Sequence, residues 1–238
     1  MAAGIMFHHF YDNNDHKKSQ GALTAEDFEK CIRFLKKDHT LLSAGEYYHK
    51  FSKNTLKAND ICFTFDDNLK CQFDIALPVM ESQNITAFWF INSGPLVNIR
   101  EQTEMYRYFR TNYYDSLDTF YTEFIGYVIE KEGVTPDELD QMEQKADEHY
   151  AAYSFYTKND KIFRFIRDWV LGRSRYQNAM ENLMQQKGIN LETSDAIRNL
   201  WMDENDIRYL HNREHIIGLH SHTHPTELKQ LDEASQKK

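Results

Sequence analysis

The stretch DICFTFDDN, residues 60–68, combines the pattern of a buried strand with two carboxylates at its end. Its apolar run has the length of a strand, and Asp66 and Asp67 follow where the run stops. Adjacent residues on an extended chain point to opposite sides, so the two aspartates can do different jobs. In parallel α/β folds the chemistry gathers at the carboxyl ends of the strands, and this stretch therefore predicts an α/β fold with a site at these two residues.

Strands and helices alternate on both sides of this stretch. One of the predicted helices opens with Thr24 as a cap and has Asp27 three residues on, which is a common helix start. Alternation of this kind favours a parallel sheet or a barrel. The expected strands are residues 4–10, 60–68, 85–91 and 216–220, and the expected helices of this part are residues 23–37 and 71–83.

A long helical block separates the third expected strand from the fourth. Thr135, followed by Pro136 at the first helical position and by Glu138, is a strong helix start, and Gly133 is expected to end the helix before it. The helices expected in this block are residues 115–133, 135–156, 161–172, 176–188, 193–202 and 204–215. We therefore divide the chain into an N-terminal α/β part (1–95), a helical insertion (96–201) and a segment that returns to the α/β part (202–238).

Composition narrows the class of protein. The 238 residues are 41% hydrophobic, enough for a sizeable core, and the net charge of −9 argues against nucleic acid or anionic lipid as the main partner. Three cysteines without paired spacing do not form a disulfide framework. No stretch has the character of a signal peptide or a membrane span, so we expect a soluble, cytoplasmic protein.

A second stretch rich in ionisable groups, IIGLHSHTHP at residues 216–225, also follows an expected strand. His220 and His224 are four residues apart, one helical turn, which would let both imidazoles face one ion. His222 would point elsewhere, toward the surroundings of the site or toward solvent. Two histidines and one aspartate form a three-ligand set with open positions, which is typical of a catalytic divalent metal rather than a structural one.

Simpler explanations stay open on the residues alone. The paired aspartates could cap the helix that follows their strand. The histidine-rich turn could be solvated, and His220 could be a hydrogen-bonded histidine of the core. The metal hypothesis is the sharper one because both stretches lie at equivalent ends of their strands.

Two motifs in order carry a resemblance to a known family. Residues 61–91 resemble the first signature of the polysaccharide deacetylases, the NodB-homology family (carbohydrate esterase family 4), which is a strand ending in Thr-Phe-Asp-Asp, a helix and an aromatic strand. Residues 213–228 resemble the second, His-Ser/Thr-x-x-His followed by proline and leucine. The resemblance covers residues 4–95 and 202–232 and leaves out the helical block.

The resemblance implies a fold, an activity and a role for each matching residue. The fold would be a distorted, here incomplete, (β/α) barrel of the NodB-homology type with a large helical insertion. Asp66 matches the catalytic base, Asp67, His220 and His224 match the metal ligands, and Ser221 matches a small hydroxyl residue that orients the loop. The metal would be Zn²⁺ first, with Co²⁺, Ni²⁺, Mn²⁺ or Fe²⁺ also suited to these ligands.

The chain also departs from the family pattern. Asn68 stands where glycine is usual, and asparagine tolerates a left-handed backbone better than most residues. The family's later motifs, which supply an arginine beside the base, a hydrophobic wall and a histidine acid, have no match before Lys238. His8 and His9, at the end of the first expected strand, are the candidates for an acid, although a polar pair at a strand end explains them too. We expect a fragment, or a shortened protein that a partner or a second copy completes.

We therefore expect a metal-dependent hydrolase that removes an acetyl group from an N-acetylated or O-acetylated sugar or saccharide precursor. An amide-bond hydrolase needs a nucleophile at neutral pH, which a metal-bound water and a nearby carboxylate base can supply. Two alternatives stay open. One is a non-catalytic module that binds metal or carbohydrate, and the other is an interaction protein that uses the helical insertion.

Overall fold

The computed structural model describes residues 2–99, 101–189, 197, 199–225 and 232–236. The chain forms two compact units, one made of Met1–Glu104 with Asp195–Lys238 and the other of Met105–Ser194. The first unit contains the sheet and both of the stretches that carry candidate site residues. The second unit is helical.

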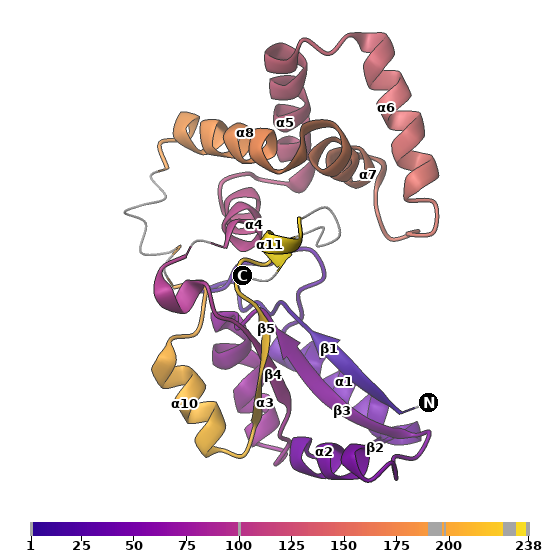
Figure 1. The fold of residues 1–238 in the computed structure, drawn as a ribbon, viewed down its shortest axis with the longest axis vertical. Helices are drawn as coiled ribbons and strands as arrows, with labels where there is room; N and C mark the ends of the chain where they lie inside the picture. The colour runs from indigo at the N-terminus through magenta and orange to yellow at the C-terminus, as the bar shows by residue number, and fades with distance from the viewer. Residues whose placement is uncertain (1, 100, 190–196, 198, 226–231, 237–238) are drawn as a thin grey trace. The chain divides into compact units, whose positions relative to one another are not determined.

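One parallel sheet is the frame of the first unit (Figure 1). The strand order is β1-β3-β4-β5, and the short β2 pairs with the first residues of β3. All the pairings are parallel, so the carboxyl ends of the strands meet at one edge, where Asp66 ends β3 and Asn92 ends β4. The strands are β1 (Ala3–Phe7), β2 (Thr40–Leu41), β3 (Asp60–Asp66), β4 (Phe88–Asn92) and β5 (Ile216–Ser221).

The sheet confirms the predicted α/β class with parallel strands. Within the described ranges, the pairings end at β1 on one edge and at β5 on the other, which makes an open sheet. Closure into a barrel therefore stays a prediction.

Aromatic side chains pack between the first helix and the sheet and also between neighbouring strands. Phe28 of α1 (Ala25–Asp38) lies edge-on to Phe7 of β1 at a centroid distance of 4.9 Å, and Phe65 of β3 stacks on Trp89 of β4 at 4.3 Å. These side chains are almost completely buried, and each contributes on the order of 2–3 kcal/mol by leaving water. The described helical elements of this unit are α1 (Ala25–Asp38), α2 (Ala44–Ser52), the π-helical segment η1 (Gln72–Ala76), α3 (Leu77–Glu81), the 3₁₀ turn η2 (Pro95–Val97), α10 (Glu204–Asn212) and the short α11 (Glu233–Gln236).

Local capping explains where the first helices begin. Thr24 accepts a hydrogen bond from the Asp27 backbone N–H at 3.0 Å, as the sequence predicts. No element is expected from the pattern of residues 38–59, yet β2 and α2 lie there. The start of α2 is nonetheless encoded locally, because Ser43 and Glu46 form a reciprocal capping box.

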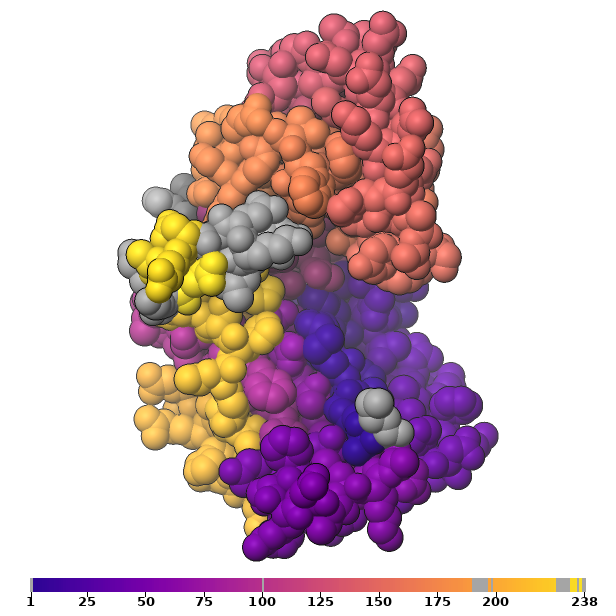
Figure 2. All heavy atoms as spheres, turned by 45° about the vertical axis from the view of Figure 1, so that its right-hand side comes forward, coloured from indigo at the N-terminus to yellow at the C-terminus, as the bar shows by residue number. Residues whose placement is uncertain are grey.

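The second unit is built from helices around a cluster of aromatic rings. Phe163 contacts Phe120 and Phe124 at centroid distances of 5.5 and 5.1 Å, and all three are buried. Figure 2 shows the side chains of this unit, coloured rose to orange, in close contact with one another. The helices are α4 (Gln102–Asn112), whose first turn belongs to the first unit, α5 (Leu117–Glu132), α6 (Pro136–His149), α7 (Lys158–Phe165), the π-helical segment η3 (Ile166–Leu171) and α8 (Gly172–Gln186).

One predicted helix is too long. The pattern of residues 135–156 predicts a single helix, but α6 ends at His149 and turns follow, with the Tyr153 N–H bonded to the Tyr150 carbonyl. The cause is a second helix start just downstream, where Thr157 and Asp160 cap α7. Tyr150, Tyr153 and Tyr156 follow one another at intervals of three residues, which is also the spacing on one face of a helix. Here their rings pack on one another in the turns.

The last expected helix of the insertion and the expected absence of a membrane span complete the comparison with the sequence. Half of the helix expected over residues 193–202 lies outside the described residues. The expectation is wrong at its carboxyl end, because residues 199–202 are not helical and Trp201 forms an isolated antiparallel bridge with Leu69. None of the described helices combines the length and hydropathy that crossing a membrane requires.

Candidate metal centre

The turn after β3 places Asp67 with a strained backbone. Asp67 and Asn68 have φ values of 74° and 44°, in the left-handed region that few residues favour. Hydrogen bonds to β4 hold this turn, because the Asp67 N–H donates to the Phe90 carbonyl at 3.1 Å and Asn68 Oδ1 accepts from the Asn92 N–H at 2.9 Å. Asn68 thus adopts the left-handed backbone that asparagine tolerates, and its side chain joins the turn to the neighbouring strand.

The loop after β5 places His224 by a different route from the one expected. The spacing of four suggested one helical turn, but His220 lies in β5 and His224 follows in a loop with φ 43°. Ser221 Oγ accepts a hydrogen bond from the His224 N–H at 2.9 Å and so bends the chain back. The ring of His222 contacts the loop after β4 instead, with Nδ1 2.9 Å from Ser93 Oγ.

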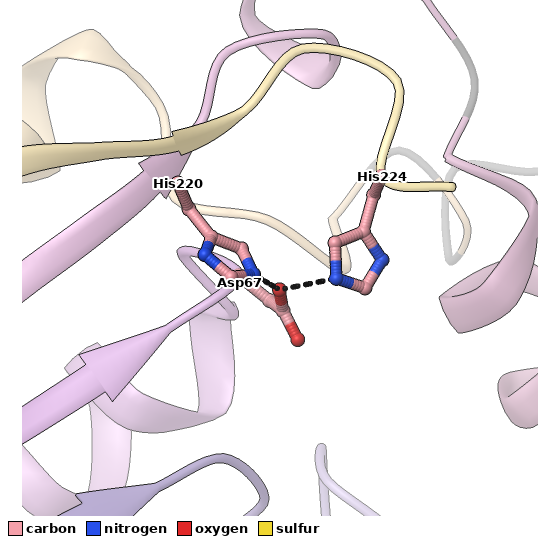
Figure 3. A group of neighbouring side chains, drawn as sticks. All are labelled: Asp67, His220 and His224. Atoms are coloured by element: carbon pink, nitrogen blue, oxygen red, sulfur yellow. Dashed lines mark ion pairs between the residues drawn. The ribbon is translucent and has the colours of Figure 1, made fainter. Parts of the chain in front are cut away.

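Asp67, His220 and His224 form one cluster (Figure 3). Asp67 Oδ1 lies 3.3 Å from Nε2 of His220 and 3.2 Å from Nε2 of His224. The three donor atoms are within 4.8 Å of one another. Residues more than 150 positions apart in the chain therefore meet at the carboxyl edge of the sheet.

The donor atoms have the chemistry and spacing of a divalent-metal site. Ligands of a tetrahedral zinc-type ion lie about 2.0–2.2 Å from it, and hence roughly 3.3–3.6 Å from one another. The distances between Asp67 Oδ1 and the two histidine nitrogens are close to this spacing. Asp67 Oδ1 is also buried without a hydrogen-bond partner, an unfavourable state for a carboxylate oxygen that a cation would relieve.

Electrostatics of the cluster follow from burial and from neighbouring carboxylates. Burial raises the pKa of the Asp67 carboxyl, and the nearby histidines oppose that shift. The pKa of His224 is also raised, first by its interaction with Glu101. A bound cation would reverse both tendencies, because it stabilises a carboxylate and a neutral imidazole.

Asp66 lies beside the cluster but is not one of its three members. It is 9% exposed at the end of β3, and its main-chain carbonyl accepts a hydrogen bond from Gln72 Nε2 at 2.7 Å. Among the described residues, no hydrogen bond or ion pair engages its carboxylate. That group is therefore available to a water or a substrate.

His8 and His9, which follow β1, lie next to different carboxylates. His8 Nε2 lies 3.8 Å from Asp67 Oδ2, and its side chain is 37% exposed. His9 Nε2 lies 2.8 Å from Oε2 of Glu104, where both side chains are largely buried. His8 therefore reaches the cluster, whereas His9 is held by a carboxylate.

Sequence reasoning missed two buried carboxylates beside the site. Glu101 and Glu104 are 3% and 6% exposed, and both lie at the start of α4. Glu101 Oε1 is 3.5 Å from Nδ1 of His224. The signal available in the sequence was only a pair of glutamates three residues apart, which is common in the first turn of any helix.

Comparisons with known proteins found slight likenesses. No family model and no curated protein matches the chain. One similar solved structure is IcaB from Ammonifex degensii, with 18% identity, 40% of this chain and 40% of that chain covered, and a TM-score of 0.35. Another is a de-N-acetylase from Aggregatibacter actinomycetemcomitans, with 17% identity, 41% and 39% covered, and a TM-score of 0.34.

A third similar structure is the deacetylase PplD from Streptococcus pyogenes in complex with acetate. The identity is 16%, the match covers 46% of this chain and 52% of that chain, and the TM-score is 0.32. The chain thus spans about half or less of the length of these structures.

Proposed function

We propose that the chain is a metal-dependent hydrolase that removes an acetyl group from an N-acetylated saccharide or saccharide precursor. The observation that carries the proposal is the position of Asp67 Oδ1, buried and unbonded between Nε2 of His220 and Nε2 of His224. The carboxylate lies 3.2–3.3 Å from the two imidazole nitrogens, and together the three side chains form a three-ligand set that leaves positions on a metal ion for other ligands. The resemblance of both motifs to the polysaccharide deacetylases supports the choice of an acetylated sugar.

Asp67, His220 and His224 would hold the metal, and Zn²⁺ suits one oxygen and two imidazole nitrogens. When bound there, such an ion would lower the pKa of water and polarise an acyl oxygen. Ser221 would hold the loop in the shape that brings His224 to the site, through its bond to the His224 N–H.

Asp66 would act as the general base. Its carboxylate lies at the same strand end as Asp67, and the described residues leave it without a hydrogen-bond partner. A base in this position accepts a proton from the water that attacks the acyl carbon. The separation of roles between adjacent aspartates follows from the turn, because Asp66 still belongs to the strand whereas Asp67 has left-handed backbone geometry.

His8 would act as the general acid. It follows the end of β1, and its Nε2 is 3.8 Å from Asp67 Oδ2, at the margin of the cluster. A partly exposed imidazole there could give a proton to the leaving nitrogen as the amide bond breaks. His9 is less suited, since Glu104 already engages its ring.

The proposal is tested by acetate release from N-acetylglucosamine oligosaccharides after loading with Zn²⁺. Wild type should release acetate, Asp67→Asn should neither hold zinc nor release acetate, and Asp66→Asn should hold zinc without releasing acetate. Zinc binding by wild type without acetate release from any N- or O-acetylated sugar would instead favour the non-catalytic binding module.

A further inference from the structure

Glu101 occupies an unusual position for a carboxylate. Its side chain is 3% exposed, and both of its oxygens bind main-chain donors at the start of α4. Oε1 accepts from the Thr103 N–H at 2.9 Å and Oε2 accepts from the Glu104 N–H at 2.7 Å. Capping of this kind needs only a short side chain such as serine or aspartate, so capping alone does not explain a glutamate here.

The same carboxylate reaches a proposed metal ligand. Oε1 lies 3.5 Å from Nδ1 of His224, and Nε2 of the same ring lies 3.2 Å from Asp67 Oδ1. The imidazole is therefore placed between two carboxylates, one at each nitrogen. Among the described residues, His220 has no comparable acceptor at Nδ1, and its only close carboxylate is Asp67.

We propose that Glu101 is a positioning residue for the metal site. It accepts the Nδ1–H of His224, which fixes the tautomer with its lone pair on Nε2 and sets the plane of the ring. This inference rests on the proposed function, because it assigns Glu101 a task at the metal site proposed there.

His224 needs such support more than His220 does. His220 is held in register by the pairing of β5 with β4, whereas His224 lies beyond the strand in a loop with a left-handed backbone. The bond to Ser221 Oγ fixes the main chain of His224 but leaves the ring free to rotate. Glu101 is held rigidly by its own two backbone donors, so it provides a fixed acceptor for that ring.

Two substitutions separate positioning from capping and from charge. Glu101→Asp keeps the charge and a good capping residue but withdraws the carboxylate from His224 by one methylene. Glu101→Gln keeps the length and an oxygen acceptor but loses the charge. Glu104→Gln is the matched control, because it removes a buried carboxylate from the same helical turn and leaves the acceptor of His224 in place.

The experiment measures the dissociation constants of Zn²⁺ and Co²⁺ by chelator competition on the full chain, with the Co²⁺ absorption spectrum as a report on ligand geometry. Thermal unfolding of the metal-free variants shows that each one folds. We expect Glu101→Asp to weaken metal binding about 10- to 100-fold and to change the cobalt spectrum. Glu101→Gln should lose less affinity than Glu101→Asp, and Glu104→Gln should lose the least.

Three results would overturn the inference, and only the last of them would also overturn the proposed function. Metal binding by wild type with unchanged affinity and spectrum in a folded Glu101→Asp would overturn the positioning role alone. An equal loss of affinity in Glu101→Gln and Glu104→Gln would also overturn it, because removal of either buried charge would then have the same effect. Absence of metal binding by wild type would remove both this inference and the proposed function.

Discussion

The main chains of Gly94 and His222 are in such close contact that a Cβ on Gly94 would overlap the carbonyl oxygen of His222. Ser93 holds the loops together at this point, because its N–H donates to the Ser221 carbonyl at 2.9 Å and its Oγ lies 2.9 Å from His222 Nδ1. The loop after β4 therefore fixes the position of the loop that carries His224. His222 serves this contact and not the metal cluster.

Gly94→Ala should weaken metal binding without removing any proposed ligand. The added methyl group must push the loop of His222 away, and such a clash costs about 1–3 kcal/mol, or about 5- to 150-fold in affinity if the loop carries the strain. Zinc titration of the variant measures the effect. Gly45→Ala is the control, since a Cβ there has no neighbour within 4 Å, and its affinity should equal that of wild type. Equal zinc affinity in both variants would show that the contact between Gly94 and the loop of His222 does not position His224.

Asp66→Asn should separate metal binding from catalysis. The amide keeps the shape of the side chain but cannot act as a base, so we expect kcat to fall by about 10²–10⁴ while zinc content stays near one per chain. Parallel measurement of zinc content and acetate release checks this. Loss of zinc together with activity would show that Asp66 is a ligand rather than the base.

His8→Gln should affect the pH dependence of the reaction as well as its rate. A general acid must be protonated to act, so its removal should lower kcat and abolish the fall of activity at high pH. His9→Gln is the comparison, because His9 pairs with Glu104 and does not reach the cluster. A pH–rate profile of His8→Gln with the same limbs as wild type would assign the acid elsewhere.

His215 predicts a dependence of stability on acid that is separate from the metal site. The residue is 4% exposed, and Nδ1 accepts hydrogen bonds from the Ala87 N–H at 3.1 Å and from Trp89 Nε1–H at 3.0 Å. Burial lowers the pKa of His215 to about 4, below its ordinary value of 6.5. The folded protein therefore holds the neutral ring, which the unfolded chain would protonate at a higher pH.

The resulting stability is present in full above pH 6.5 and is lost as the pH falls from 6.5 toward 4. Between neutral pH and pH 5 we expect a loss of about 2 kcal/mol in the free energy of unfolding from this group. Urea unfolding at several pH values measures it. His215→Asn cannot titrate in this range and should show a shallower slope between pH 7 and 5. The same slope in both proteins would remove His215 as the cause.

Much of the fold around the site follows from local patterns in the sequence. The strand that ends at Asp66 and the helix that begins after Thr24 are encoded by short apolar runs and by caps, and both occur as predicted. The overlong helix predicted for residues 135–156 shows the limit of periodicity, because mutual packing of aromatic rings in a turn produces the same spacing as a helix face.

The site itself could be predicted only in part. Asp67, His220 and His224 meet as their positions at strand ends suggested, but the geometry of His224 comes from Ser221 and a left-handed backbone rather than from a helical turn. Glu101 gave no sequence signal, because its role depends on where the chain after β4 returns. Contacts of that kind arise from tertiary structure and cannot be inferred from spacing.

The most direct test of the account is the metal content of the full chain, measured by mass spectrometry on protein purified without a nickel column and after zinc is supplied. The account predicts about one metal ion per chain in wild type and a large loss in His220→Ala and Asp67→Asn. Wild type without bound metal, or a metal content that both variants retain, would contradict the central claim that Asp67, His220 and His224 form a metal centre.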